Sequence, residues 1–360
     1  MNKTSTIYFN NVDAFKGIAI LGILLVHCGA ADLGGVIGEL SSAGAKGVQI
    51  FLIISSMLIF KSLQKEHEKK EGISLKAWYI KRFIRLIPLY YIANLFVLVK
   101  DGLTSSYWSG THGMTMGTII SNFLFIHGLY PWWSNAININ WYIGTLAIFI
   151  VAAPLLYRLM DRIDKLFILL ALSWLCNIIC NHTIGTIDFG EDTYVWTAYW
   201  MNFSIVAQLP VLVIGMILYY ILEKTDILNT IKRHLSNGKK SFCYAATGVC
   251  LLWLFFMIHH GAVIVEYALV FAIMIFISFI DKICLIENPI FKTLGKYSYG
   301  IYLFHFPLLE IAQKLFGQQI GNLKIYICYI VVLIVSFLLS WILVRLVERP
   351  IVYLCTKKHS

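Results

Sequence analysis

A basic side chain and a histidine share one face of the first long apolar segment, VDAFKGIAILGILLVH (12–27). Lys16 and His27 are eleven residues apart. In a helix, eleven steps of about 100° return to within ~20° of the same face, ~16 Å along the axis. Ionisable groups at membrane depth are costly, so each is a candidate for function, and Gly17 and Gly22 permit close helix approach. A snorkelling lysine and a hydrogen-bonded structural histidine explain the same pattern, and the sequence leaves both interpretations open.

A pair of arginines stands near the start of another long apolar segment, in YIKRFIRLIPLYY (79–91). Arg82 and Arg85 are three residues apart, so a helix places them on one face. Guanidinium groups bind phosphate through two hydrogen bonds, and the N-terminal end of a helix also favours anions. The alternative is an anchor that contacts lipid headgroups, as we expect for Lys81. Pro88, which bends a helix, argues for a special geometry at the arginine pair.

Polar groups recur in the last two apolar segments. His305 lies deep in apolar sequence, one to two turns after Ser298 and Tyr299. For His305 we favour a hydrogen bond between helices over direct chemistry. Arg345 and Glu348 have i, i+3 spacing, and we expect them to pair with each other.

An imidazole that lies beyond a group of cations indicates general-base chemistry on a substrate with an anionic handle. Acyl-CoA is such a substrate. Its phosphates would contact Arg82, Arg85 and Lys16, and its pantetheine arm would carry the thioester ~15 Å to His27. There the imidazole would deprotonate a hydroxyl or relay the acyl group, and both routes stay open. No Gly-x-Ser-x-Gly, His-Glu-x-x-His or phosphate-binding glycine loop offers a competing chemistry.

The composition is that of a polytopic membrane protein. Of the 360 residues, 59% are hydrophobic and 13% are charged, against about 45–50% and about 25% in soluble domains. This excludes a soluble enzyme, a disordered protein and a disulfide-stapled secreted module. The net charge of +10 fits cytoplasmic loops and contact with anionic lipid better than nucleic-acid binding. The eight cysteines are scattered, so we expect no metal site.

We predict an all-α fold, a transmembrane bundle of about ten helices that are each long enough to cross a bilayer. The predicted spans are 13–31, 47–64, 79–99, 141–158, 166–181, 203–222, 242–258, 262–280, 294–316 and 325–346. A cytoplasmic N-terminus puts 25 of the 29 Lys and Arg residues on the inner side, so we expect both termini in the cytoplasm. The apolar run 118–129 is short, and a crossing there would undo this distribution, so we predict that it does not cross.

Spaced motifs in the first three predicted spans resemble those of a known family. Lys16 and His27 match a pattern of a basic residue, ten intervening residues and His. Arg82 and Arg85 match an Arg-x-x-Arg pattern that continues through Pro and Tyr. IFLIISSML (50–58) is similar to a Phe-Phe-x-x-Ser-Gly pattern, with Ser55 matching and a serine in place of the glycine.

Two further motifs follow in order near the C-terminus. The stretch 295–307 meets the pattern Gly-x-x-Ser-Tyr-x-x-Tyr-Leu-x-His-x-Pro through Ser298, Tyr299 and His305, and Glu348 begins a Glu-x-Pro. Together the five motifs identify the chain as similar to membrane-integral acyltransferase family 3, whose members O-acylate bacterial glycans. The resemblance covers nearly the whole chain, so we expect one integral-membrane acyltransferase domain, 1–360, with no further domain fused to it.

The resemblance implies His27 as the catalytic residue and Arg82 and Arg85, with Lys16, as acyl-CoA contacts. We expect six more residues in supporting or structural positions: Asp13, Ser55, Ser298, Tyr299, His305 and Glu348. One departure is clear. Many members carry an acidic residue in a Trp-Ser-Leu-x-x-Glu pattern, where this chain has Leu146 at the end of WYIGTL.

The function that we expect is transfer of an acyl group, with acetyl as first choice, from acyl-CoA to a hydroxyl of a surface or exported polysaccharide or of its lipid-linked precursor. The expected setting is the cytoplasmic membrane, with membrane lipid, acyl-CoA and a glycan as partners, and no bound cofactor or nucleic acid. The alternative is a multi-pass transporter or flippase for an anionic or glycolipid substrate, whose pathway the same polar residues would line. A purely structural membrane protein would not need them.

Overall fold

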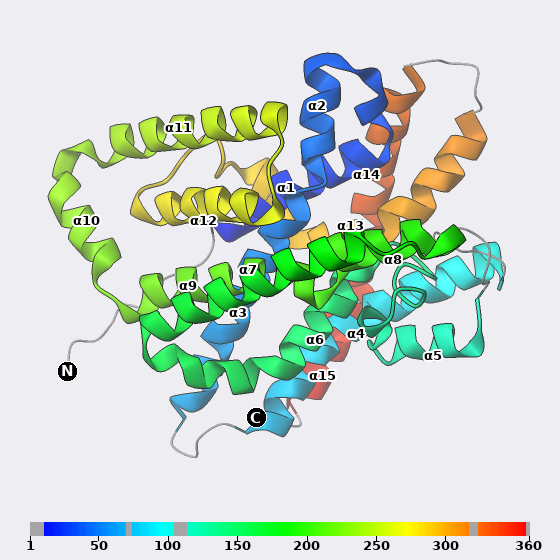
Figure 1. Cartoon of the computed structure of the whole chain (residues 1–360), viewed down its shortest axis with the longest axis horizontal. Helices are drawn as coiled ribbons and strands as arrows, with labels where there is room; N and C mark the ends of the chain where they lie inside the picture. The colour runs from blue at the N-terminus through cyan, green and yellow to red at the C-terminus, as the bar shows by residue number, and fades with distance from the viewer. Residues whose placement is uncertain (1–10, 70–73, 104–113, 317–322, 358–360) are drawn as a thin grey trace.

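The computed structural model of the chain describes residues 11–69, 74–103, 114–316 and 323–357 as an assembly of helices (Figure 1). Within these ranges there is no strand. The α-helices are α1 (Val12–His27), α2 (Gly35–Gly44), α3 (Gly47–His67), α4 (Leu75–Asp101), α5 (Met116–Phe123), α6 (Trp141–Leu156), α7 (Ile163–Gly185), α8 (Thr193–Ala198), α9 (Ile205–Lys224), α10 (Ile227–Leu235), α11 (Lys239–His260), α12 (Ile264–Ile280), α13 (Pro289–Phe316), α14 (Leu323–Leu343) and α15 (Arg349–Lys357). Short turns η2 (His127–Leu129), η3 (Tyr157–Asp161) and η7 (Val344–Glu348) also matter below.

Each of the ten predicted spans coincides with a helix, so the all-α class is confirmed. Among the residues that the structure describes, seven helical stretches are long and apolar enough to cross a membrane: Gly35–His67, Leu75–Asp101, Trp141–Asp161, Ile163–Gly185, Gly190–Lys224, Ile227–His260 and Leu323–Cys355. Helices α1 and α12, of 16 and 17 residues, fall short of the ~20 that a span needs. The number ten and the sides of the two termini stay predictions.

The apolar run 118–129 does not form a long helix. Helix α5 has eight residues, which extend ~12 Å at 1.5 Å per residue, and η2 follows after a break. Its first turn is held by a capping box, in which Thr115 and Thr118 each accept a hydrogen bond from the other's backbone N–H. This element is therefore too short to cross a hydrocarbon core of ~30 Å.

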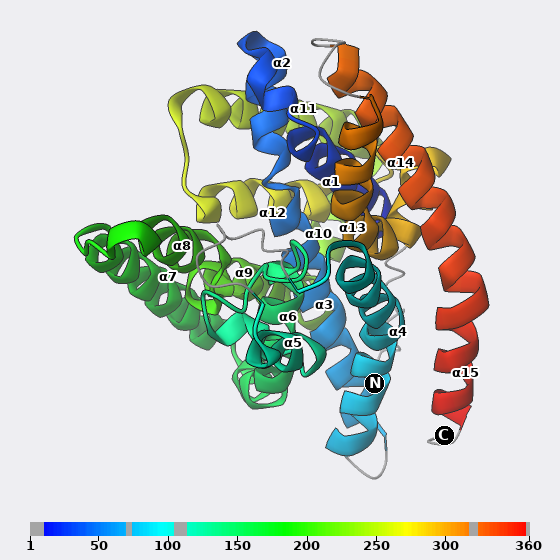
Figure 2. The same ribbon diagram turned by 90° about the vertical axis from the view of Figure 1, so that its right-hand side faces the viewer.

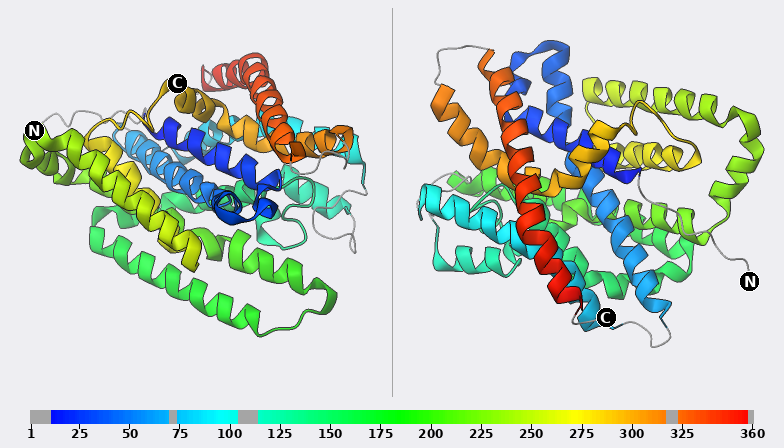
Figure 3. Two further views of the ribbon diagram at one scale, coloured as in Figure 1. Left: turned by 90° about the horizontal axis from the view of Figure 1, so that it is seen from above. Right: turned by 180° about the vertical axis from the view of Figure 1, so that it is seen from behind.

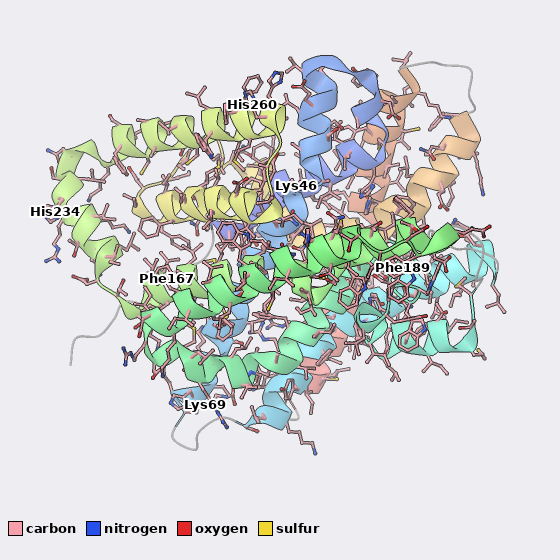
Figure 4. All side chains as sticks on the ribbon, viewed as in Figure 1. Lys46, Lys69, Phe167, Phe189, His234 and His260 are labelled. Carbon is pink, nitrogen blue, oxygen red and sulfur yellow. The ribbon has the colours of Figure 1, made fainter. Side chains whose placement is uncertain are left out.

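Helices α3 and α9 lie inside the bundle, whereas α7 runs along its edge (Figure 3). Helix α14 continues through η7 into α15 along another side (Figure 2). Large apolar side chains are exposed on the outer helices, such as Phe167 on α7 (Figure 4) and Trp253 on α11, which are 51% and 56% exposed. Such surfaces suit lipid rather than water.

Helices α1 and α13 pack backbone to backbone. A Cβ atom on Gly17 would overlap the carbonyl oxygen of Phe291, and a Cβ atom on Gly295 would overlap that of Asp13. Glycine at both positions lets the helix axes approach closely, as small residues do at membrane helix interfaces. This contact holds the polar residues of α1 against those of α13.

Candidate active site

A cavity of about 270 Å³ lies inside the bundle, among α1, α3, α4, α6, α13 and η7. We call it the central cavity. Six of the predicted site residues line it, from five different elements: Lys16, Ser55, Arg85, Ser298, Tyr299 and Glu348. The structure therefore brings together residues that lie more than 300 positions apart in the chain.

The central cavity carries an excess of positive charge. Lys16, Arg85 and Lys296 line it, against one lining carboxylate, that of Glu348. Lys16 is paired with Asp13 through an Nζ–Oδ1 distance of 2.8 Å. In the part of the chain that the structure describes, Arg85 and Lys296 have no ion-pair or hydrogen-bond partner. The Glu348 carboxylate acts on Arg85 from the same wall, so the three cations exceed Asp13 and Glu348 by one positive charge, which favours an anionic ligand.

The two arginines of α4 have different surroundings. Arg82 donates from Nη2 to the backbone carbonyl oxygen of Leu58 at 3.1 Å, and its guanidinium lies 5.9 Å from the ring centroid of Trp78. Arg82 thus connects α4 to α3 and does not line the central cavity. Arg85 lines this cavity. The i, i+3 spacing predicted that both arginines lie on one face of the helix. In the folded protein Arg82 contacts α3, whereas Arg85 lines the central cavity.

Glu348 does not pair with Arg345, contrary to our expectation. The guanidinium of Arg345 lies 4.1 Å from the ring centroid of Trp341, and no hydrogen bond or ion pair joins it to Glu348 among the described residues. The pairing prediction was wrong because it assumed a regular i, i+3 helix, while this segment is the π-helical turn η7. The Glu348 carboxylate instead faces the central cavity.

His27 and His305 lie against each other, with ring centroids 5.2 Å apart and an interplanar angle of 43°. His305 is buried, and its Nδ1 donates to the carbonyl oxygen of Tyr302 at 2.6 Å. This bond lies within α13, so the hydrogen bond between helices that we favoured for His305 is not formed. Because Nδ1 is the donor, Nε2 is the acceptor nitrogen of the neutral imidazole. That Nε2 is buried and has no partner in the described chain.

A proline explains how a loop is attached beside His305. Pro307 has no N–H, so the carbonyl of Leu303, four residues earlier, loses its helical donor. Asn138, in the segment before α6, donates from Nδ2 to this carbonyl oxygen at 2.8 Å. The contact closes the break and fixes the loop next to the histidine pair. We did not predict it, although the proline pointed to an unpaired carbonyl in need of a donor.

Two tyrosines that sequence reasoning left without a role line the central cavity, and one of them, Tyr302, also contacts a histidine. Tyr302 lines the cavity, and its ring centroid lies 5.6 Å from that of His305. Its hydroxyl is buried and has no partner among the described residues. Tyr142, with its ring 5.5 Å from Tyr302, shares a 2.9 Å hydrogen bond with Ser55. His27 is absent from the lining, and its ring is connected to the cavity wall only through contact with His305, which in turn contacts Tyr302.

A family model described as an acyltransferase domain, that of acyltransferase family 3, matches residues 9–345. The chain belongs to this acyltransferase family. O-acetyltransferase OatA of Staphylococcus aureus strain NCTC 8325 is 26% identical over 374 residues, which cover 96% of this chain and 57% of OatA. A second staphylococcal protein, from strain COL, is provisionally named an O-acetyltransferase; it is 24% identical over 392 residues, or 97% of this chain and 59% of that protein. The acyltransferase-family chain thus spans little more than half the length of these relatives. No solved structure matches it significantly.

The departure at Leu146 also falls in the central cavity of this family member, because Leu146 is one of its lining residues. An apolar side chain therefore stands where an acidic one was implied by the resemblance. Over the described residues there is also no group of three His, Cys, Asp or Glu side chains placed to hold a metal ion.

Proposed function

We propose that this acyltransferase-family protein is a membrane-bound O-acyltransferase that moves an acetyl group from acetyl-CoA to a hydroxyl of a glycan. The observation that carries the proposal is the sequence of groups from Lys16, Arg85 and Lys296, through the central cavity, to Tyr302 and the two histidines. A donor with phosphates at one end and a thioester at the other suits this order of charge and imidazole.

The cations take the phosphates of the donor. Arg85 and Lys296 form no salt bridge in the described chain, so a phosphate does not have to break one, and the Glu348 carboxylate acts on Arg85 only from across the cavity wall. Lys16 keeps Asp13 as its partner at 2.8 Å and supplies a weaker attraction. The pantetheine arm then follows the cavity toward Tyr142 and Tyr302.

The histidine pair carries the chemistry. The acceptor hydroxyl donates its proton to His27 as its oxygen attacks the thioester carbonyl carbon, which forms the new C–O bond. Collapse of the tetrahedral intermediate breaks the C–S bond, and the CoA thiolate takes the proton back from His27. His305 presents its unpartnered Nε2 beside this imidazole and orients the hydroxyl or His27 as a hydrogen-bond acceptor. The products are the O-acetyl ester and free CoA.

Transfer to an oxygen atom is supported by the relatives, two of which are named O-acetyltransferases, and a glycan as the acceptor is what the family resemblance implies. We place the reaction in the cytoplasmic membrane and assign a surface or exported polysaccharide, or its lipid-linked precursor, as the acceptor. Membrane helices that surround the site suit an acceptor that arrives with a lipid or at the lipid surface.

The test is acyl transfer by the purified full chain in nanodiscs, followed as CoA release from acetyl-CoA in the presence of glycan acceptors. We expect His27→Ala to lower the rate by ~10²–10⁴-fold, the usual contribution of a general base. His182→Ala on α7 is the control, because His182 is remote from the cavity residues in sequence and does not line the cavity. Movement of a glycolipid without CoA release would favour a transporter and refute the proposal, and so would full activity of the His27→Ala variant.

A further inference from the structure

A second cavity, of about 750 Å³, lies where the ends of α3, α4 and α6 meet η3 and the last residue of α9. We call it the terminal cavity. Helices α3, α4 and α6 line both cavities. On α3, Leu58 lines the central cavity and Gln64 lines the terminal cavity. On α4, Arg85 lines the central cavity and Tyr79 lines the terminal cavity. Six residues of helix correspond to ~9 Å. The two cavities therefore follow one another along a shared set of helices.

The terminal cavity has basic groups in its wall. Arg158, Lys224 and His67 line it together with one carboxylate, that of Asp161. Asp161 is engaged by Lys165, with an Nζ–Oδ2 distance of 2.7 Å. Arg158 has no hydrogen-bond or ion-pair partner in the described part of the chain. A net positive charge is therefore available to a ligand.

The remaining polar groups of this wall are held in place. Gln64 accepts hydrogen bonds on Oε1 from the hydroxyl of Tyr157 at 2.6 Å and from Lys224 at 2.5 Å, and its amide nitrogen donates to Glu68 at 2.6 Å. Tyr79 donates to a backbone carbonyl of α6 at 2.8 Å. Both tyrosine rings are thus oriented before a ligand arrives, which lowers the entropy that binding costs.

We propose that the terminal cavity binds the 3′-phosphorylated adenosine of the CoA donor, with Arg158 and Lys224 on the 3′-phosphate and a tyrosine ring against the base. The inference rests on the proposed function. Small-molecule sites usually enclose ~300–1,000 Å³, so the central cavity at about 270 Å³ is too small for the whole donor and the terminal cavity at about 750 Å³ has room for its nucleoside. The diphosphate lies between them, near Arg85.

The headgroup of an anionic phospholipid offers the same phosphate chemistry to Arg158. The aromatic ring of Tyr79 favours the nucleotide, because a base stacks on an aromatic face and a headgroup does not. Tyr157 already stacks on Phe60. The experiment separates the two ligands by the 3′-phosphate, which lipids lack.

The probe is adenosine 3′,5′-bisphosphate, compared with adenosine 5′-monophosphate, and binding is measured by calorimetry on the full chain in nanodiscs of zwitterionic lipid. We expect wild-type protein to bind the bisphosphate at least ~10-fold more tightly, since the 3′-phosphate adds a charge-assisted hydrogen bond to Arg158. Arg158→Gln should remove most of this preference and leave the monophosphate unchanged, and Arg158→Lys should restore part of it. Arg162→Gln is the matched control, because Arg162 is bonded to Asp164 outside the cavity.

Equal binding of the two nucleotides by wild-type protein, or an equal loss of both in Arg158→Gln, would overturn the inference. In a parallel set of nanodiscs that contain anionic lipid, an Arg158 substitution that alters binding of this lipid and not nucleotide binding would also overturn the inference and assign the cavity to a headgroup. Because the readout is binding, it is separate from acyl transfer. Absence of CoA release with every acceptor would refute the proposed function while the nucleotide result still stands or falls by itself.

Discussion

The imidazole of His27 lies 5.2 Å, centroid to centroid, from the imidazole of His305. The two rings come from helices at opposite ends of the sequence, and α1 and α13 meet through glycines that admit no side chain. Because His305 donates through Nδ1 to its own helix, the unprotonated Nε2 is available beside His27. This arrangement makes the histidine pair, rather than either ring alone, the centre of the candidate site.

The two arginines of α4 should differ in function. Arg85→Gln should raise the KM for acetyl-CoA by ~10-fold or more, because a phosphate loses a charged hydrogen-bond donor. Arg82→Gln removes the hydrogen bond to Leu58 and should lower the free energy of unfolding by about 1 kcal/mol with a smaller change in KM. Donor titrations and thermal melts in detergent measure the two effects. Equal changes in KM for both variants would contradict the division of their contacts.

The Tyr302 hydroxyl is a candidate for contact with the donor or with the reacting groups. It is buried without a partner in the described chain, so Tyr302→Phe should leave the melting temperature unchanged or raise it, since an unsatisfied polar group is removed. We expect the turnover rate to fall ~10-fold or more. Tyr297→Phe, at a buried position on the same helix that does not line the cavity, is the control. Unaltered turnover in Tyr302→Phe would leave the hydroxyl without a role in the reaction.

The contact between Asn138 and the Leu303 carbonyl can be tested as a pair with Pro307. Asn138→Ala leaves that carbonyl unpaired and should lower the free energy of unfolding by about 1–3 kcal/mol. Pro307→Ala returns an N–H to the helix. Asn138→Ala should therefore lower the free energy of unfolding by less in the Pro307→Ala background than in the wild-type background. Thermal melts of the four proteins form a double-mutant cycle. Strict additivity of the two substitutions would show that the loop is not held by the break in α13.

Because α1 packs closely on α13, the effect of a Gly→Ala substitution on stability should depend strongly on where the glycine lies. Gly295→Ala places a methyl group on the Asp13 carbonyl oxygen and should destabilise the protein by about 1–3 kcal/mol or more. Gly248→Ala on α11 has open space around the added carbon and should stabilise by about 0.5–1 kcal/mol, as alanine replaces glycine within a helix. Melting temperatures report both. A tolerated Gly295→Ala substitution would mean that the two helices are not in backbone contact.

The sequence by itself determined the helices and the spacing within each one, because hydrophobic runs and the 1.5 Å rise depend on local chemistry alone. It therefore predicted Lys16 and His27 on one stripe of α1 and the presence of helices at all ten predicted segments. The sequence also predicted that the short apolar run 118–129 does not cross the bilayer, and the eight residues of α5 agree with this prediction.

Only the tertiary structure decided which side chains meet across helices, because that depends on how each helix is rotated and how closely its backbone approaches the next. It placed Lys296 in the wall of the same cavity as Arg85, turned Arg82 toward Leu58, and put Tyr302 in contact with both the central cavity and His305. The contact of Asn138 with Leu303 joins a loop to a helix 165 residues away. The periodicity of the sequence does not reveal such pairs, since the energy that selects them comes from packing and hydrogen bonding in three dimensions.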